Sequence, residues 1–198
     1  MTRSVVRSRN LLLILVLGAI LVAAVGWQLA ATRSVGNPAS AAVNVRITMA
    51  VVGQVQGAFK GDDFAIGKNS VGLINVLAFS AELNSPRDAA TGLPTGKRVW
   101  KPVVATHLLG GSSPQFMGAA ARNENLKSVT INFYHSDRAG KEINYYRVTL
   151  TNASVSNVRQ YSSGGDVLED DSFTFQKIEE QDFIAKTDFI DSFSTDLS

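Results

Sequence analysis

The residues of this chain that could perform chemistry are few and far apart. The sequence holds two histidines, His107 and His135, and neither lies at a metal-ligand spacing from another histidine, aspartate or glutamate. We therefore predict structural roles for both. Asp62 and Asp63 could form an acid–base pair or bind a cation, but adjacent side chains of a loop point apart more often than together. We interpret these two aspartates as solvated loop residues.

Other motifs resemble reactive sites only superficially. The stretch GLPTGK has glycines and a lysine like a phosphate-binding loop, but the glycine spacing is wrong and no helix is expected after Lys97. No serine lies in a nucleophile-elbow pattern. Tyr134, Tyr145 and Tyr146 lack a matching basic stripe, which favours sheet packing over stacking on nucleic acid. The sequence thus predicts no enzyme, no cofactor, no metal site and no nucleic-acid partner.

The composition fits one globular domain with appendages. The chain has 198 residues, and 45% of them are hydrophobic, which is enough for one sizeable core. The formal net charge is only +2, so no strong field favours nucleic acid or an anionic membrane as a partner. Cysteine is absent, which excludes disulfides and thiolate metal sites.

The N-terminal segment predicts export across the cytoplasmic membrane. Arg3, Arg7 and Arg9 precede a hydrophobic stretch over 11–31, whose length lies between that of a signal peptide and that of a membrane-spanning helix. Residues 1–31 are thus either a cleaved signal peptide or a signal anchor. Both place the remainder outside the cytoplasm, because the arginines hold the N-terminus inside. Residues 32–42 are expected to form a small-residue linker.

The rest of the chain has the pattern of a β-rich domain. Residues 43–52 alternate between apolar and polar side chains, as in a half-buried strand. The clearest hairpin joins residues 127–135 to residues 143–152, and residues 153–161 and 171–180 follow as further strands. About seven short strands without a βαβ rhythm predict an antiparallel barrel or sandwich.

One short helix is expected among these strands. Ser113 is a suitable N-cap, and Pro114 follows it at the first helical position. Phe116, Met117 and Ala120 are expected to share one face of this helix, directed toward the core.

Two strands and the segment between them suggest contacts with other molecules. Residues 73–83 are apolar on both faces, so they need cover from a helix or from another subunit. Residues 99–109 contain Pro102, which predicts an edge strand or a bulged strand. Between them lies Ser85–Arg98, SPRDAATGLPTGKR, which is far longer than an ordinary hairpin loop. The residues alone fit either a mobile insertion or an ordered functional loop.

Several of these motifs, in this order, resemble the haemolysin-coregulated protein (Hcp) family, the tube protein of bacterial type VI secretion. The motifs are VLAFS, SPRDAATGLPTGKR, YHSDRAGKEINYY and FTFQKIE, and the resemblance extends over Val45–Glu179. It implies a mainly β fold over 43–180, an antiparallel barrel with one short flanking helix and a long projecting loop. It also implies hexameric rings that stack into a tube inside a sheath, with a spike protein at the tip and secreted effectors as cargo, and no catalysis.

The resemblance also implies a role for the long loop. In the family such a loop projects from the barrel and contacts neighbouring subunits and stacked rings. Its charged residues can make complementary contacts, and its prolines lower the cost of ordering it. Carried over to this sequence, the contact residues are Ser85, Pro86, Arg87, Asp88, Pro94, Thr95, Gly96, Lys97 and Arg98.

Both ends of the chain depart from the family pattern. Tube proteins normally lack an export signal, so residues 1–31 favour an alternative function, an exported or membrane-anchored Hcp-like binding module that works outside a type VI machine. Residues 181–198 are predicted to form an acidic tail. The heptad spacing of Phe183, Ile190 and Leu197 would also suit an amphipathic helix.

Overall fold

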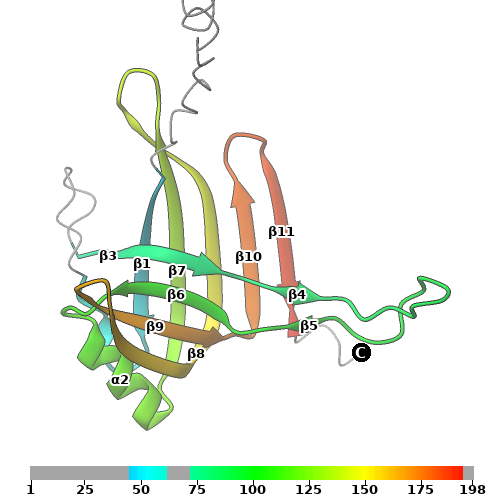
Figure 1. Cartoon of the computed structure of the whole chain (residues 1–198), viewed down its shortest axis with the longest axis horizontal. Coiled ribbons are helices and arrows are strands. Elements are labelled where there is room, and N and C mark those ends of the chain that lie inside the picture. Colours follow the sequence, from blue (N-terminus) through cyan, green and yellow to red (C-terminus); the bar gives the residue numbers. More distant parts are fainter. Residues whose placement is uncertain (1–44, 62–71, 194–198) are drawn as a thin grey trace, which may run out of the picture. The chain divides into compact units, whose positions relative to one another are not determined.

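The computed structural model describes residues 45–61 and 72–193 of the chain (Figure 1). The elements in chain order are β1 (Arg46–Gly53), β2 (Gly57–Ala58), β3 (Ile74–Ser80), β4 (Leu83–Asn84), β5 (Val99–Trp100), β6 (Val103–Leu108), α2 (Ser113–Arg122), β7 (Asn125–Ser136), β8 (Glu142–Ser163), β9 (Asp166–Thr174), β10 (Lys177–Asp182) and β11 (Thr187–Ser192). The predicted export segment, the linker, Asp62 and Asp63 lie outside the described residues. Within the described ranges, no helix has the length and apolar character needed to cross a membrane.

Antiparallel pairing closes six of the strands into a barrel. The strands follow the order β11-β10-β8-β7-β1-β3-β6-β9, and β9 pairs again with β8, which joins the two ends of the six-stranded part. β10 and β11 extend the sheet beyond β8. Figure 1 shows β1, β7, β8, β10 and β11 running side by side, with β3, β6 and β9 crossing them. The predicted antiparallel barrel with one short helix and a long projecting loop is confirmed.

The barrel closes because β8 changes its partner part-way along its length. Up to Thr151 this strand pairs with β10, and from Ser154 it pairs with β9. Asn152, between the two segments, has a positive φ of 48°, which turns the strand without ending it. The sequence predicts two strands here, whereas the structure has one. Conversely, the single strand predicted over 171–180 is divided into β9 and β10. These two strands pair with different segments of β8.

Apolar residues at alternating strand positions fill the barrel. Val129 lies opposite Leu150 and Ile131 lies opposite Val148 across the β7–β8 pair, and all four are fully buried. Among the described residues, the buried core comprises Met49, Val51, Phe59, Ile74, Val76, Val103, Ala105, Phe116, Ala119, Leu126, Val129, Ile131, Phe133, Val148, Leu150, Ala153, Val155, Phe173, Phe175 and Ile178. Strand alternation therefore predicts the interior correctly.

Helix α2 forms where it was expected, but details of the prediction are wrong. The N-cap is Ser112, not Ser113, so Pro114 is the second helical residue and not the first. Phe116 and Ala119 are buried, whereas Met117 is 44% exposed. Met117 lies about 100° around the helix from Phe116, which takes it off the narrow face that contacts the barrel.

The strands on either side of the long loop also differ from the prediction. β6 pairs with β3 on one side and with β9 on the other, so it is not an edge strand, and Pro102 lies just before it. In β3, Ile74 and Val76 are buried, whereas Leu77 on the outer surface is 51% exposed. The register of the β3–β6 pair shifts after Val76, so the side chains that follow in β3 do not continue the same alternation. Within the described residues, the prediction that both faces of this strand are covered therefore fails at Leu77.

The segment predicted as an acidic tail or amphipathic helix is a β-hairpin up to residue 193. β10 and β11 pair along their whole lengths, from Lys177 opposite Ser192 to Asp182 opposite Thr187. The heptad spacing is misleading because Ile190 alternates with Phe189 and Asp191 in a strand. The prediction of a tail or helix is therefore wrong for 181–193, and residues 194–198 lie outside the described ranges.

Candidate functional site

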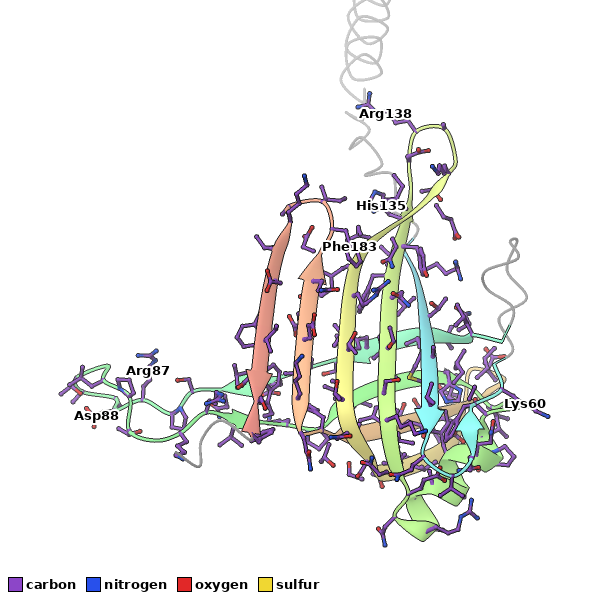
Figure 2. The ribbon with its side chains drawn as sticks, turned by 180° about the vertical axis from the view of Figure 1, so that it is seen from behind. Lys60, Arg87, Asp88, His135, Arg138 and Phe183 are labelled. Atoms are coloured by element: carbon purple, nitrogen blue, oxygen red, sulfur yellow. The ribbon has the colours of Figure 1, made fainter. Side chains whose placement is uncertain are left out.

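The long loop is a folded ribbon that extends from the barrel between β3 and β6. At its base β4 pairs with β5, and further out Arg87 and Pro94 form a β-bridge. Beyond the bridge, the Asp88 amide donates to the Leu93 carbonyl at 2.9 Å. Figure 2 shows Arg87 and Asp88 near the far end of the ribbon, well away from the barrel. This internal pairing indicates an ordered loop and not a mobile insertion.

The base of the ribbon is fastened to the C-terminal strand β11. The Arg98 guanidinium donates through two nitrogens to the two carboxylate oxygens of Asp191. The Trp100 indole also donates, from Nε1 to Asp191 Oδ2 at 2.8 Å. The hydrogen bond from Arg98, with that from Trp100, lowers the pKa of Asp191 although partial burial opposes the carboxylate charge. A planar bidentate pair of this kind fixes the orientation of the guanidinium relative to the carboxylate as well as the distance between them.

The charged residues of the ribbon therefore differ in what they offer a partner. Arg98 already has an internal partner, Asp191. Asp88 caps a turn, because its carboxylate accepts hydrogen bonds from the Ala90 and Thr91 amides and from the Thr91 hydroxyl, and the Thr91 bonds lower its pKa. Within the described ranges, the Arg87 guanidinium donates to the Gly92 carbonyl alone, at 3.2 Å. Of the four charges predicted to make subunit contacts, Arg87 and Lys97 remain exposed without a carboxylate partner among the described residues.

Apolar side chains are also exposed on the ribbon and on β11. Leu93 is 64% exposed near the tip of the ribbon. On β11, Phe189 and Ile190 are exposed on opposite faces of the strand. β11 ends the strand order of the sheet, and no described strand pairs with its outer side. Open strand edges with apolar side chains readily pair with another chain.

A second group of polar residues lies inside the barrel. His107 on β6 lies opposite Glu169 on β9, and Asp171 lies two residues further along β9 on the same face. His107 Nε2 is 2.8 Å from Asp171 Oδ2 and 3.4 Å from Glu169 Oε1. All three side chains are buried, and Phe116 of α2 packs against the imidazole.

Charge and burial act against each other in this group. Burial alone would lower the pKa of His107, but hydrogen bonding to Asp171 and Glu169 outweighs burial and raises it to about 10. Burial raises the pKa of Asp171 to about 6, although the neighbouring imidazolium opposes the shift. Burial likewise opposes the charge on Glu169, yet its hydrogen bonds with His107 and Gln160 lower its pKa. In the absence of another ligand, His107 is thus an imidazolium that faces two carboxylates.

The sequence prediction missed this group because the partners come from distant strands. Asp171 lies 64 residues after His107, so no local spacing connects them. One signal was available in the sequence: Glu169 and Asp171 stand four and two residues before Phe173, so in a strand they share its inner face. His135 does not join the group, and its ring packs on Tyr145 with centroids 5.0 Å apart.

Comparison with known proteins connects this fold to a family. The sequence profile of the family described as "Type VI secretion system effector, Hcp" matches residues 49–181. A curated relative from Pseudomonas aeruginosa, named "Major exported protein", is 33% identical over 147 residues, which cover 66% of this chain and 84% of that protein. The chain belongs to the Hcp family.

Solved Hcp structures share the fold of this chain. A crystal structure of an Hcp protein superposes with a TM-score of 0.70 at 21% identity and covers 75% of this chain and 99% of that one. Mutants of the Hcp1 protein from the Escherichia coli EAEC 042 pathovar give a TM-score of 0.68 at 25% identity, with 75% and 98% covered. The family match spans the barrel, the helix and the whole ribbon, so the ribbon is part of the Hcp region of the chain.

Proposed function

We propose that this chain is a structural subunit of a type VI secretion tube, in which hexameric rings stack and enclose secreted effectors. The family match over residues 49–181 carries this proposal. The same match supports a structural role in preference to an enzymatic one. Further partners under this proposal are the sheath and the spike protein, and the name "Major exported protein" of the relative supports export of this chain as well.

Three surfaces of the subunit suit contacts with further copies. The outer side of β11 is open for pairing and carries Phe189 and Ile190. The ribbon presents Leu93 together with the cations Arg87 and Lys97. Leu77 on β3 is an exposed apolar residue on the barrel wall. Rings built from one kind of subunit join two different surfaces of each copy, and these patches lie on different elements.

The ribbon proposal is tested by reversing the two charges that lack carboxylate partners. In the double variant Arg87→Glu and Lys97→Glu, we expect the full-length protein to form fewer or shorter stacks in negative-stain images. The matched control, Arg87→Lys with Lys97→Arg, keeps both charges and should assemble like the unmodified protein. Arg98 is left intact because its replacement would detach the ribbon from β11. Unchanged assembly of the reversed variant would remove the ribbon from the proposed contacts.

A second candidate function follows from the N-terminal sequence. Arg3, Arg7 and Arg9 before the hydrophobic stretch over 11–31 favour an exported or membrane-anchored Hcp-like binding module outside a type VI machine. Cell fractionation with mass spectrometry of the mature N-terminus tests this alternative. An intact N-terminus in the membrane fraction supports an anchor, and a shortened one in the exported fraction supports a signal peptide. Recovery of the intact chain from the cytoplasm alone would contradict both.

A further inference from the structure

The buried polar group His107, Glu169 and Asp171 has the arrangement of a metal-binding site. The pairing of β6 with β9 places His107 directly opposite Glu169, and the two-residue strand period brings Asp171 to the same inner face. One ligand atom from each residue lies within 4.8 Å of the other two. The exposed fraction is 1% for His107 and 0% for both acids. A single ion could therefore contact all three residues inside the barrel.

The outer hydrogen bonds aim the three donor atoms at one another. His107 Nδ1 lies 2.7 Å from the Leu108 carbonyl, to which it donates, so the remaining ring nitrogen, Nε2, faces the two carboxylates. Gln160 donates to Glu169 Oε2 at 2.5 Å, which leaves Oε1 directed toward His107. Histidine ligands of metals usually donate their second ring nitrogen to a carbonyl or a carboxylate, and ligating carboxylates are usually held by a further hydrogen bond.

Two carboxylate oxygens of the group, Glu169 Oε1 and Asp171 Oδ1, are buried without a hydrogen bond of good geometry from the described residues. His107 Nε2 lies 3.4 Å from Glu169 Oε1, which is a long contact. A buried acceptor without a good partner is unfavourable, and more so when it is charged. Residues with such atoms are rare in folded proteins, and an unseen ion is one of the few physical explanations for them.

The charge balance of the group favours a dication over a proton. With an imidazolium, the two carboxylates leave a net charge of −1 inside the barrel. With a neutral imidazole and a divalent cation, the same two carboxylates give a net charge of zero. Isolated buried charge is strongly unfavourable, so the neutral combination costs less desolvation energy.

We propose that His107, Glu169 and Asp171 bind a zinc-like divalent cation through one nitrogen and two carboxylate oxygens. Imidazole and carboxylate together suit zinc and its first-row neighbours, whereas magnesium and calcium prefer oxygen alone. Binding displaces the proton from His107 Nε2 and involves no change of oxidation state. The ion joins β6 to β9 beside α2, where Phe116 packs on the imidazole, so its role is to fasten the barrel. Because the group is buried, the ion enters as the barrel folds.

The test measures zinc content and thermal stability after refolding. Full-length protein without a histidine tag is unfolded in denaturant with chelator and refolded in mild detergent with zinc, with magnesium or with chelator alone. We expect one zinc ion per chain and a higher Tm in zinc than in magnesium or chelator. Zinc content no higher than that of Asp171→Asn, or a Tm equal in zinc and chelator, would overturn the proposal.

Matched variants separate this site from adventitious binding. Asp170→Asn changes the same kind of residue on the same strand, but its carboxylate contacts Thr106 and Tyr161 instead of the imidazole, so this variant should keep its zinc. Glu169→Gln and Asp171→Asn should lose it. If those two fail to refold, His107→Lys supplies an ammonium group to the carboxylates in place of the imidazole ligand. A folded His107→Lys protein with a Tm that zinc still raises would contradict the site.

Discussion

At the scale of single residues, the contact between Arg98 and Asp191 changes the interpretation of the long loop. The sequence suggests that Arg98 contacts another subunit, whereas the structure pairs it with Asp191 of the same chain. This contact, with a further hydrogen bond from Trp100, holds the base of the ribbon against β11. The ribbon thus has a direction that is fixed within the single chain.

Replacement of Asp191 by asparagine should destabilise the chain. The substitution removes the charge that Arg98 and Trp100 contact, and a hydrogen-bonded charged group of this kind contributes about 2 kcal/mol. We expect a loss of this size in the free energy of unfolding, measured by urea denaturation of the full-length protein. Asp188→Asn, an exposed aspartate on the same strand, should change it by less than about 0.5 kcal/mol. Equal effects of both substitutions would contradict the assignment of the anchor.

The same contact should depend on pH. The pKa of Asp191 in the folded chain is lower than that of an ordinary aspartate, about 3.9. Its stabilisation is therefore complete above about pH 4 and declines as the pH falls through the lowered pKa. The stability difference between the unmodified chain and Asp191→Asn should shrink as the pH decreases from neutral toward 3. A difference that grows on acidification would contradict this sign.

At the scale of elements, local patterns predicted the type of most segments but not their continuity. Alternation identified β7 and the first half of β8, and the serine–proline start identified α2. The turn within β8 at Asn152 and the break between β9 and β10 have no local signal, because they arise where one strand exchanges partners. The hairpin of β10 and β11 was missed for a different reason, because its apolar residues also fit a heptad spacing.

The two neighbouring residues Phe116 and Met117 test how α2 packs on the barrel. Phe116 is fully buried and contacts the rings of Phe59, His107 and Phe173, so Phe116→Ala should cost about 3–5 kcal/mol of unfolding free energy. Met117 is exposed, and Met117→Ala should cost less than about 0.5 kcal/mol. Chemical denaturation monitored by tryptophan fluorescence measures both values. A larger cost for Met117 than for Phe116 would mean that the helix is rotated about its axis.

At the scale of the whole molecule, the fold class was predictable but the interior polar group and the loop anchor were not. Strand alternation predicts an antiparallel barrel or sandwich, because alternation depends only on which side chains lie inside, and the family resemblance implies the barrel. His107 with Asp171, and Arg98 with Asp191, join residues that no sequence spacing relates. These long-range contacts decide which charges are available to a partner, and they leave Arg87 and Lys97 exposed on the ribbon.

The open edge of the sheet gives a prediction for assembly. Ile190 on the outer strand β11 is 51% exposed, so Ile190→Lys should leave the unfolding free energy of a single chain nearly unchanged. A charge at this edge should nevertheless weaken pairing with another copy. We expect a lower assembled fraction in size-exclusion chromatography with light scattering, while Thr187→Lys at the turn end of the same strand serves as control. Full assembly of Ile190→Lys would exclude β11 from the ring contact.

The most direct test of the account is the mass and shape of the full-length protein in solution. Light scattering after size exclusion, in mild detergent, gives the number of chains per particle, and negative-stain images of the same fractions show their outline. The tube-subunit proposal predicts particles with the mass of six chains that appear as rings, with stacks of rings at high concentration. A particle with the mass of one chain at the highest attainable concentration, without rings in the images, would contradict it.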